Sequence, residues 1–341
     1  MTNNMRVRLT DPLSTTRDLT GHRAVVTGGT GGLGAITTRT LAARGATVIV
    51  GARGTERGEQ VRQALLAEHR LPQDRIRVLP LDLIDPDSIH RFADLVGRDP
   101  LDTLVLNAAM SSVPFGRDRN GTERQFATNH LGHFALTGRL LPALRSAASA
   151  RIITVSSSLY PSGKLDLDRL ADASGYSPGR AYIRSKLANA MFAVELNRRL
   201  EATGSAARSF GAHPGMARTP LHTTYPSRAT RAATGILARV IGREPEPADI
   251  GVLAAALSDG VSPQLFWGPG GSKANPYAVG VPYARRATDL RSAVELWDAS
   301  ERLTGVRYLS RTAPASGTSP ASGTAPASGT SHSGPQASRA G

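Results

Sequence analysis

Residues 24–34 read Ala-Val-Val-Thr-Gly-Gly-Thr-Gly-Gly-Leu-Gly, and this stretch decides the fold. The apolar run Ala24–Thr27 predicts a buried strand, and the Ala- and Leu-patterned segment Ala35–Arg44 predicts a helix. Glycines between a strand and a helix let the backbone approach a pyrophosphate, which free N–H groups at the helix N-terminus can bind. A plain tight turn is the alternative for a glycine run alone, and the flanking elements argue against it. We therefore expect a bound dinucleotide to contact Gly28, Thr30, Gly31, Gly32, Leu33 and Gly34.

The end of the next strand bears on which dinucleotide binds. Thr47–Val50 predicts a buried strand, and Gly51, Ala52 and Arg53 follow it. In dinucleotide-binding folds an acid at this place binds the ribose 2′-hydroxyl, whereas an Arg accommodates a 2′-phosphate. The absence of an acid and the presence of Arg53 favour NADP(H). An exposed arginine without a role remains the alternative in a chain this rich in arginine.

Strands and helices alternate beyond this point, which predicts a parallel sheet with helices on both faces. The strand Ile76–Leu79 is followed by Asp82 and Leu83, which are expected to wall the adenine. The strand Thr103–Leu106 ends at Asn107 and Ala108, and ligands bind at such carboxyl ends in open α/β sheets. We therefore expect all four residues to contact the cofactor.

A long helical pattern, Glu123–Leu144, contains Asn129, His130 and His133. Asparagine is locally unfavourable inside a helix, so the Asn129 amide is expected to hold a water or a backbone carbonyl. The two histidines are three residues apart, but no third ligand is evident. Satisfied structural roles are therefore predicted for them, and no metal site.

The segment Ala181–Ala190 carries the predicted chemistry. Tyr182 and Lys186 are four residues apart on an expected helix, so their side chains share one face. A free phenol has a pKa of about 10, and a neighbouring ammonium lowers it by favouring the phenolate. Such a tyrosine can pass a proton to or from an oxygen, although an ordinary surface pair is the alternative reading. Tyr160 and Lys164 have the same spacing, but Pro161 and Gly163 between them predict a loop.

Several further segments complete the expected domain. The strand Arg151–Val155 ends in three serines, and the loop-rich insertion Leu159–Gly179 follows. A strand over Ala207–Ala212 precedes further expected cofactor contacts at Pro214, Gly215 and Thr219, and a mobile segment is expected at Leu221–Ile241. The remaining expected elements are a helix at Pro247–Leu257, a strand at Gln264–Trp267 and a helix at Ala293–Thr304.

Composition limits the class of protein. The chain has 341 residues, no cysteine and a formal net charge of +14. Without cysteine it has no disulfide or thiolate chemistry, which fits a cytoplasmic protein. No signal peptide or bilayer-spanning run is evident. The arginines are scattered and not interleaved with aromatic residues, so a coding bias explains them better than a nucleic-acid partner.

The ends of the chain differ from its body in composition. The sequence Pro-Ala-Ser-Gly-Thr occurs three times after Arg311, and a segment without large apolar residues cannot offset its ordering entropy. We therefore predict a flexible N-terminal extension at 1–18, a single catalytic domain at 19–308 and a disordered tail at 309–341.

Taken together, these motifs resemble the short-chain dehydrogenase/reductase family over about 19–306. Four landmarks match in order, namely Thr27-Gly28-x-x-x-Gly32-x-Gly34, Asn107-Ala108-Ala109, the serines after Val155, and Tyr182-x-x-x-Lys186. The runs Asn129-His130-Leu131-Gly132-His133-Phe134 and Ser185-Lys186-Leu187-Ala188-Asn189 are similar to the retinol dehydrogenase and protochlorophyllide reductase branch. The family's usual Asn-Asn-Ala-Gly reads Leu-Asn-Ala-Ala at 106–109 here.

The resemblance implies a Rossmann fold, that is, a doubly wound parallel sheet, and a catalytic set of Asn129, Ser157, Tyr182 and Lys186. Ser157 would bind the substrate oxygen and Tyr182 would donate the proton. Lys186 would lower the Tyr182 pKa and bind the nicotinamide ribose, and Asn129 would support a relay water. Tyr182 and Lys186 are thus expected to contact the cofactor as well.

The predicted function is NADP(H)-dependent hydride transfer to or from a carbonyl or secondary alcohol of a small apolar or polycyclic molecule. An epimerase or dehydratase on the same scaffold, or a cofactor-sensing binding protein, remains the alternative. The expected partner is the small-molecule substrate, with no nucleic acid and no membrane, and homo-oligomerisation is left open.

Overall fold

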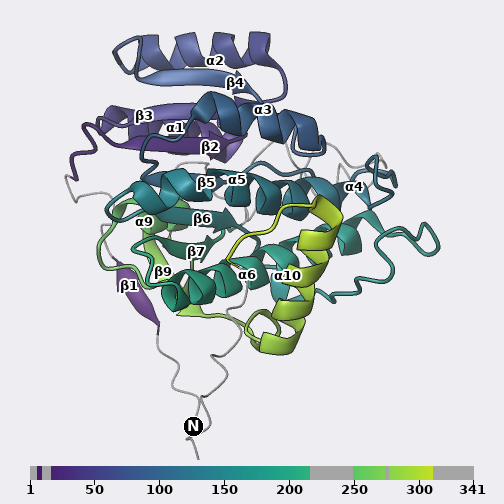
Figure 1. The fold of residues 1–341 in the computed structure, drawn as a ribbon. Coiled ribbons are helices and arrows are strands. Elements are labelled where there is room, and N and C mark those ends of the chain that lie inside the picture. Colours follow the sequence, from purple (N-terminus) through teal and green to yellow (C-terminus); the bar gives the residue numbers. More distant parts are fainter. Residues whose placement is uncertain (1–5, 10–16, 216–248, 273–275, 310–341) are drawn as a thin grey trace, which may run out of the picture. The chain divides into compact units, whose positions relative to one another are not determined.

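The computed structural model describes residues 6–9, 17–215, 249–272 and 276–309 (Figure 1). The strands are β1 (Val7–Leu9), β2 (Arg23–Thr27), β3 (Thr47–Ala52), β4 (Ile76–Pro80), β5 (Thr103–Leu106), β6 (Arg151–Val155), β7 (Arg208–Ala212), β8 (Leu265–Gly271) and β9 (Pro276–Pro282). The helices are α1 (Gly32–Ala43), α2 (Thr55–Glu68), α3 (Pro86–Val96), α4 (Arg124–Phe126), α5 (Gly132–Ser146), α6 (Pro178–Ala202), α9 (Ile250–Leu257) and α10 (Leu290–Thr304). The predicted segment Leu221–Ile241, the predicted cofactor contact Thr219 and residues 310–341 lie outside the described residues.

The described strands form one sheet in the order β1-β9-β8-β7-β6-β5-β2-β3-β4. The strands from β4 to β8 in this order are parallel, whereas β9 and β1 are antiparallel to their neighbours. After β1 at the far edge, the chain enters the parallel part of the sheet at β2, runs outward through β3 and β4, and returns to the other side of β2 at β5. This reversal confirms the predicted doubly wound fold, and ligands bind such sheets where the strand order reverses.

Alternation along the strands distributes the core between the two faces of the sheet. Val25 and Leu104 pack in one buried cluster with residues of α3, α5, α6 and α10. Their strand neighbours Val26 and Val105 pack in a second cluster with residues of α1, α2 and α9. Successive strand side chains point to opposite faces, so continuous apolar strands need helices on both sides. Figure 1 shows the helices of the first cluster lying across the front of the sheet.

Polar caps fix where several helices begin. Ser177 accepts a hydrogen bond from the Arg180 amide at the start of α6, and Pro178 occupies the first helical position. Asp85 caps α3 and Asp289 caps α10 in the same way. These side chains satisfy amides that have no partner within the helix. The Tyr182 helix therefore starts a turn earlier than the pattern Ala181–Ala190 alone indicates.

The sheet is wider than the sequence predicts. The strand expected at Gln264–Trp267 continues to Gly271 and forms an antiparallel pair with β9, which the sequence did not indicate. Both strands contain proline and glycine, which ordinarily argue against a strand. The expected flexible extension at 1–18 is wrong at residues 7–9, because β1 pairs with β9 through Val7, Arg8 and Leu9.

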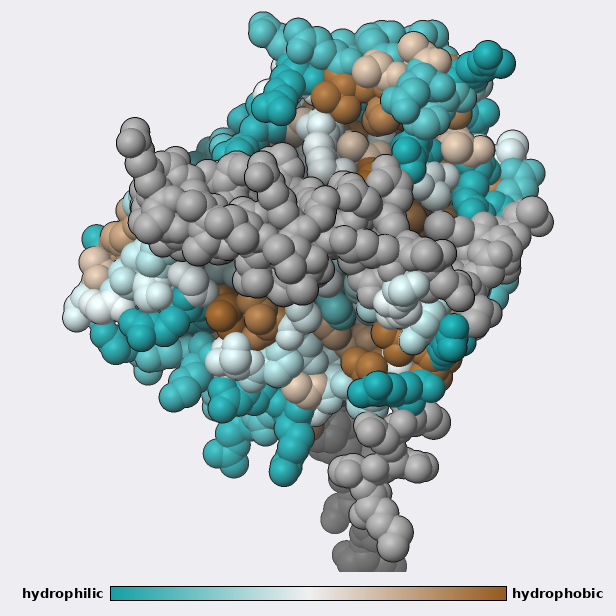
Figure 2. Space-filling view, turned by 180° about the vertical axis from the view of Figure 1, so that it is seen from behind, coloured by the Kyte–Doolittle hydropathy of each residue, from teal (hydrophilic) through white to brown (hydrophobic). Residues whose placement is uncertain are grey.

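The surface of the described residues carries few large apolar side chains, of which Leu95, Leu159 and Leu290 are at least half exposed. Figure 2 shows hydrophobic residues as separate patches among largely hydrophilic atoms on one face of the molecule. Within the described ranges, no helix combines the length and apolarity that crossing a bilayer would need.

Deletion of residues 1–9 tests the contribution of β1. Removal of β1 exposes the outer edge of β9 and uncovers the half-buried Val7 and Leu9 side chains, so the melting temperature should fall by several degrees and aggregation on heating should increase. Differential scanning calorimetry of this variant beside a deletion of residues 1–5 checks it. Equal melting temperatures in the two variants would show that β1 does not stabilise the sheet.

Candidate active site

A cleft of about 490 Å³ opens at the carboxyl ends of β2, β3, β5 and β6. Most of the predicted cofactor contacts line it: Gly28, Thr30, Gly31, Gly32, Leu33, Gly34, Arg53, Asp82, Leu83, Asn107, Ala108, Tyr182, Lys186 and Pro214. Gly215 follows Pro214 directly but does not line the cleft. Residues far apart in the chain thus meet where the strand order reverses.

The glycine loop fits a close approach by a ligand. Gly28 has a φ of +65°, which L-residues rarely adopt. A Cβ at Gly34 would lie 2.3 Å from the Gly28 carbonyl oxygen, so only glycine fits there. Helix α1 has a glycine at its N-cap, no side-chain cap and no acid in its first turn. Its first amides therefore face the cleft without a competing acceptor from a cap, as pyrophosphate binding requires.

One hydrogen-bonded cluster holds the neighbouring strand ends together. The Thr27 hydroxyl accepts from the Asn107 and Ala108 amides at 2.9 and 3.0 Å, and the Asn107 side chain donates to the Thr27 carbonyl at 3.0 Å. His133 Nε2 lies 2.9 Å from the same hydroxyl, and its Nδ1 lies 3.0 Å from the Asn129 carbonyl oxygen. Because a carbonyl only accepts, Nδ1 carries the proton and Thr27 donates to Nε2.

The histidines have structural partners, as predicted. Burial lowers the pKa of His130 and of His133 to about 3, so both rings are neutral at ordinary pH. His130 Nε2 lies 2.9 Å from the Ser300 hydroxyl on α10. Each ring therefore links its helix to another element.

The far end of the cleft carries the residues expected at the adenosine. Ala52, Arg53 and Arg57 line it together with Asp82 and Leu83. Arg53 is exposed at the end of β3, and Arg57 lies in the first turn of α2. At the end of β3 itself, Ala52 and Arg53 offer a cation and no acid, whereas Asp82 is the acid that follows β4 at the same end of the cleft. Arginine at such a strand end accommodates a phosphate on the ribose in dinucleotide-binding folds.

Tyr182 and Lys186 lie on one face of α6, as predicted from their spacing. The Lys186 ammonium is 5.8 Å from the centre of the Tyr182 ring. Lys186 is 2% exposed and donates to the Val155 carbonyl at 2.9 Å. Burial lowers the pKa of this amine to about 7, because the surroundings disfavour its charged form. Tyr182 is half-buried and lines the cleft, and the Lys186 side chain lies beside its ring.

The three serines after β6 have different surroundings. Ser156 is buried and donates to the Lys186 carbonyl at 2.6 Å, which is a structural bond to α6. Ser158 is exposed. Ser157 is half-buried, and its oxygen accepts from the Leu159 amide at 3.2 Å, which leaves its proton available to donate. Ser157 does not line the cleft, whereas Ser156 does.

Asn129 lies in a π-helical turn, Ala127–Leu131, which interrupts the long helix that the sequence predicted over Glu123–Leu144. Its side chain accepts from the Met110 amide and donates to the Met110 carbonyl, both at 2.9 Å. It also donates to the Ser185 hydroxyl at 3.0 Å. Of the two predicted partners, a backbone carbonyl is thus present. Every polar group of this amide is engaged by protein, so Asn129 fixes the positions of a loop and of α6.

Tyr160 and Lys164 do not share one face of an α-helix, as predicted. Tyr160 begins a short 3₁₀ turn, Tyr160–Ser162, and its buried hydroxyl accepts from the Ala284 amide at 2.7 Å. Burial raises the pKa of this phenol. Lys164 is exposed.

Sequence reasoning missed several residues of the cleft, namely Gly54, Leu81, Met110, Thr128 and Val155. Gly54, Leu81 and Met110 lie one or two residues from a predicted cofactor contact, so the predicted contacts at these strand ends were too few. Thr128 and Val155 lie one and two residues from Asn129 and Ser157, which were predicted as catalytic residues. Thr128 lies in the π turn Ala127–Leu131, which the sequence did not predict.

Comparisons with known proteins agree with this geometry. The short chain dehydrogenase family model matches residues 22–230. Mouse polyprenol dehydrogenase is 38% identical over 236 residues, which cover 66% of this chain and 68% of that protein. Human retinol dehydrogenase 12 is 38% identical over 205 residues, which cover 60% of this chain and 64% of that protein. The chain thus spans about two thirds of the length of these relatives.

Among solved structures, an uncharacterised protein from Mycobacterium paratuberculosis superposes with a TM-score of 0.67 at 38% identity. The match covers 86% of this chain and 97% of that one. The family match, the relatives and the fold agree, and the chain belongs to the short-chain dehydrogenase/reductase family, in its retinol dehydrogenase-like branch.

Proposed function

We propose that this oxidoreductase uses NADP(H) to interconvert an apolar carbonyl compound and its alcohol. The observation that carries the proposal is the Tyr182–Lys186 pair, which lies in the same cleft as the glycine loop and Arg53. The donor set fits a nicotinamide dinucleotide, since α1 offers uncapped amides, Gly34 leaves no room for a side chain, and Arg53 and Arg57 suit a phosphate. The bound cofactor would supply or accept the hydride.

The protein supplies position and a proton. Ser157 would donate a hydrogen bond to the substrate carbonyl oxygen, and Tyr182 would give its proton to that oxygen as hydride reaches the carbon. The ammonium form of Lys186 beside the ring would favour the phenolate that remains. Asn129 would act through the two segments it joins, the Met110 loop and α6. In the oxidative direction the same groups take the proton back.

The substrate class follows from the site and from the relatives together. The relatives named retinol and polyprenol dehydrogenases act, by those names, on apolar alcohols. In this chain Met110 lines the cleft and Leu159, two residues after Ser157, is 53% exposed. Apolar surface beside a polar catalytic centre suits a small polar group on an apolar molecule. Oxidation of NADPH against a panel of aldehydes and ketones, with retinal and a polycyclic ketone included, tests the activity.

Tyr182→Phe should reduce kcat at least about a hundredfold, because it removes the proton donor and leaves the ring in place. Affinity for NADPH, measured by fluorescence titration, should stay near that of the wild type. Tyr160→Phe is the matched control, since its hydroxyl accepts from the Ala284 amide and Tyr160 is not among the residues that line the cleft. Activity that survives the Tyr182 change and is lost with the Tyr160 change would overturn the assignment.

The double variant Ala52→Asp, Arg53→Ala should reverse cofactor preference. A charge-assisted bond from Arg53 to a 2′-phosphate would favour NADPH about tenfold, and an acid at position 52 would repel that phosphate. Values of kcat/KM for NADH and NADPH in both proteins decide the matter. If the wild type used the two cofactors equally, Arg53 would have no such role.

Lys186→Met should stabilise the cofactor-free protein, most strongly at low pH. The native amine titrates near pH 7, whereas its unfolded-state pKa is that of an ordinary lysine, 10.5. Between these values the unfolded wild type binds more protons, so its stability rises with pH across this window. The gain from Lys186→Met should therefore be largest below pH 7 and shrink as the pH approaches 10, even though the variant is inactive.

Urea unfolding at pH 6, 8 and 9.5 measures this trend. Lys164→Met, at an exposed lysine, is the control. A stability difference that is the same at all three pH values would contradict a buried ammonium at position 186.

A further inference from the structure

The loop that leaves β5 contains a strained residue. Ser112 has a φ of +55°, in the left-handed region that costs an L-residue energy. Of the non-glycine residues with positive φ in the described ranges, Ser112 is the buried one, at 2% exposure. The loop Met110–Val113 continues the wall of the cleft, since Met110 lines it. Something must hold this backbone in its unusual shape.

Gln125 on α4 holds it. This side chain is fully buried, and its oxygen accepts from the Ser112 amide at 2.8 Å. Its nitrogen donates to the Tyr176 hydroxyl at 2.8 Å and to the Pro178 carbonyl at 3.0 Å. A carboxamide has two N–H donors and one carbonyl oxygen, so one buried side chain uses all its polar atoms to join three segments.

Tyr176 adds a second hydrogen bond to this loop, at Val113, the residue after Ser112. Its hydroxyl lies 3.0 Å from the Val113 carbonyl oxygen and 3.3 Å from a carboxylate oxygen of Glu123. Burial and the nearby carboxylate raise the pKa of Tyr176 to about 12, so the phenol keeps its proton and donates. Its ring packs edge-on against the Phe115 ring, with 5.2 Å between the ring centroids.

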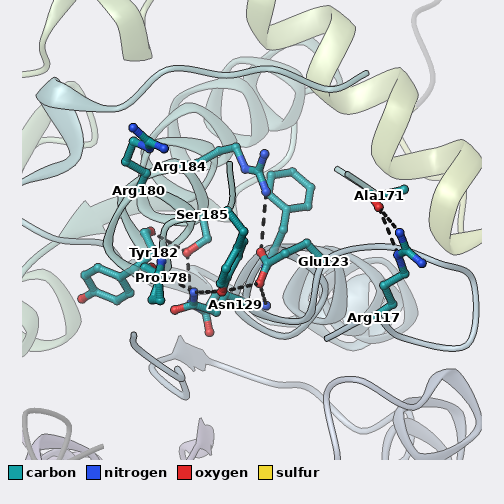
Figure 3. A network of polar contacts seen from close by, with 12 residues as sticks. Arg117, Glu123, Asn129, Ala171, Pro178, Arg180, Tyr182, Arg184 and Ser185 are labelled. Atoms are coloured by element: carbon teal, nitrogen blue, oxygen red, sulfur yellow. Dashed lines mark hydrogen bonds and ion pairs between the residues drawn. The ribbon is translucent and has the colours of Figure 1, made fainter. Parts of the chain in front are cut away.

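The same cluster reaches the catalytic helix. Pro178 is in the first turn of α6, four residues before Tyr182. Arg184 on α6 lies 3.6 Å from the buried Glu123 carboxylate, and Ser185 bonds Asn129. Figure 3 shows the side chains of Glu123, Asn129, Arg184 and Ser185 close together, with Tyr182 and Pro178 beside them. The loop wall and α6 are thus held by one network.

We propose that Gln125 and Tyr176 are positioning residues that hold the loop Met110–Val113 in its strained shape, and that this loop forms the substrate-side wall of the catalytic pocket. Neither residue touches the cleft, so each acts through the loop. The part that concerns substrate rests on the proposed function. The part that concerns the shape of the loop does not.

Hydrogen–deuterium exchange tests the shape of the loop without any substrate. Gln125→Met and Tyr176→Phe should speed exchange in the peptide that covers residues 107–116, because the Ser112 amide or the Val113 carbonyl loses its partner. Tyr308→Phe is the matched control, since that buried hydroxyl also donates to a backbone carbonyl, at Phe134, away from the loop. Exchange equal to that of the wild type in both loop variants would overturn the proposal.

Steady-state kinetics with NADPH and retinal, or the first carbonyl of the panel that the wild type reduces, tests the role of the wall. In Gln125→Met the KM for the carbonyl should rise about tenfold, the ratio expected if an unsupported left-handed residue relaxes. The Kd of NADPH should remain within about twofold, because the glycine loop and Arg53 are untouched. Ser112→Gly alone should leave the KM nearly unchanged. In the Gln125→Met background it should bring the raised KM most of the way back to the wild-type value, because glycine adopts positive φ without strain.

A merely structural role would not give this rescue. A parallel loss of melting temperature and NADPH affinity without rescue by Ser112→Gly would overturn the proposal, as would faster loop exchange with an unchanged KM. If the wild type reduces no carbonyl of the panel, the proposed function fails. Faster exchange in the loop variants would then still support the role of Gln125 and Tyr176 in holding the loop.

Discussion

The cleft depends on how the ends of β2 and β5 are joined. These strands are neighbours in the sheet although about eighty residues separate them in the chain, and the Asn107 side chain donates to the carbonyl of Thr27. The Thr27 hydroxyl in turn accepts from both amides that follow β5. Gly34 packs against this junction so closely that no Cβ fits. The glycine loop, the wall of the cleft and the start of α1 therefore take their positions from one small set of buried bonds.

The second half of the site is held together by hydrogen bonds of the Asn129 and His133 side chains. Asn129 joins the Met110 loop to α6, and His133 ties the Asn129 carbonyl to Thr27. Asn129 lies in the π turn Ala127–Leu131, and such turns inside α-helices are frequent at functional sites. Together these contacts form a continuous path of hydrogen bonds from the glycine loop to Ser185, one residue before Lys186. Groups that must meet within hydrogen-bond distance need this kind of support.

Sequence reasoning succeeded where the determinant is local. The spacing of Tyr182 and Lys186 fixes their common face on any helix, and glycine between a strand and a helix fixes the cradle at Gly28 and Gly34. It could not place Gln125 against Ser112, because that contact depends on how a loop and α4 pack in three dimensions. It missed β9 because proline and glycine disfavour strands in general, although Pro276 and Pro282 stand only at the two ends of this strand. The three adjacent serines are alike in the sequence, and only the structure shows that Ser156 is buried, Ser157 half-buried and Ser158 exposed.

The buried lysine shows how function and stability oppose each other in this fold. Lys186 is 2% exposed, and its ammonium donates to the neutral Val155 carbonyl, with no carboxylate partner among the residues that the structure describes. A buried cation without an anionic partner destabilises the native state, and the protein reduces that cost by lowering the amine pKa to about 7. A carboxylate beside Lys186 would reduce the free-energy cost of burying the ammonium. It would also offset the effect of that charge on Tyr182 and repel the phosphates of a bound nucleotide. The apolar surroundings keep that charge effective toward the phenol, since electrostatic interactions are stronger where water is excluded. Under the function proposed above, the same burial that weakens the fold at this position also strengthens the effect of the Lys186 ammonium on the neighbouring phenol.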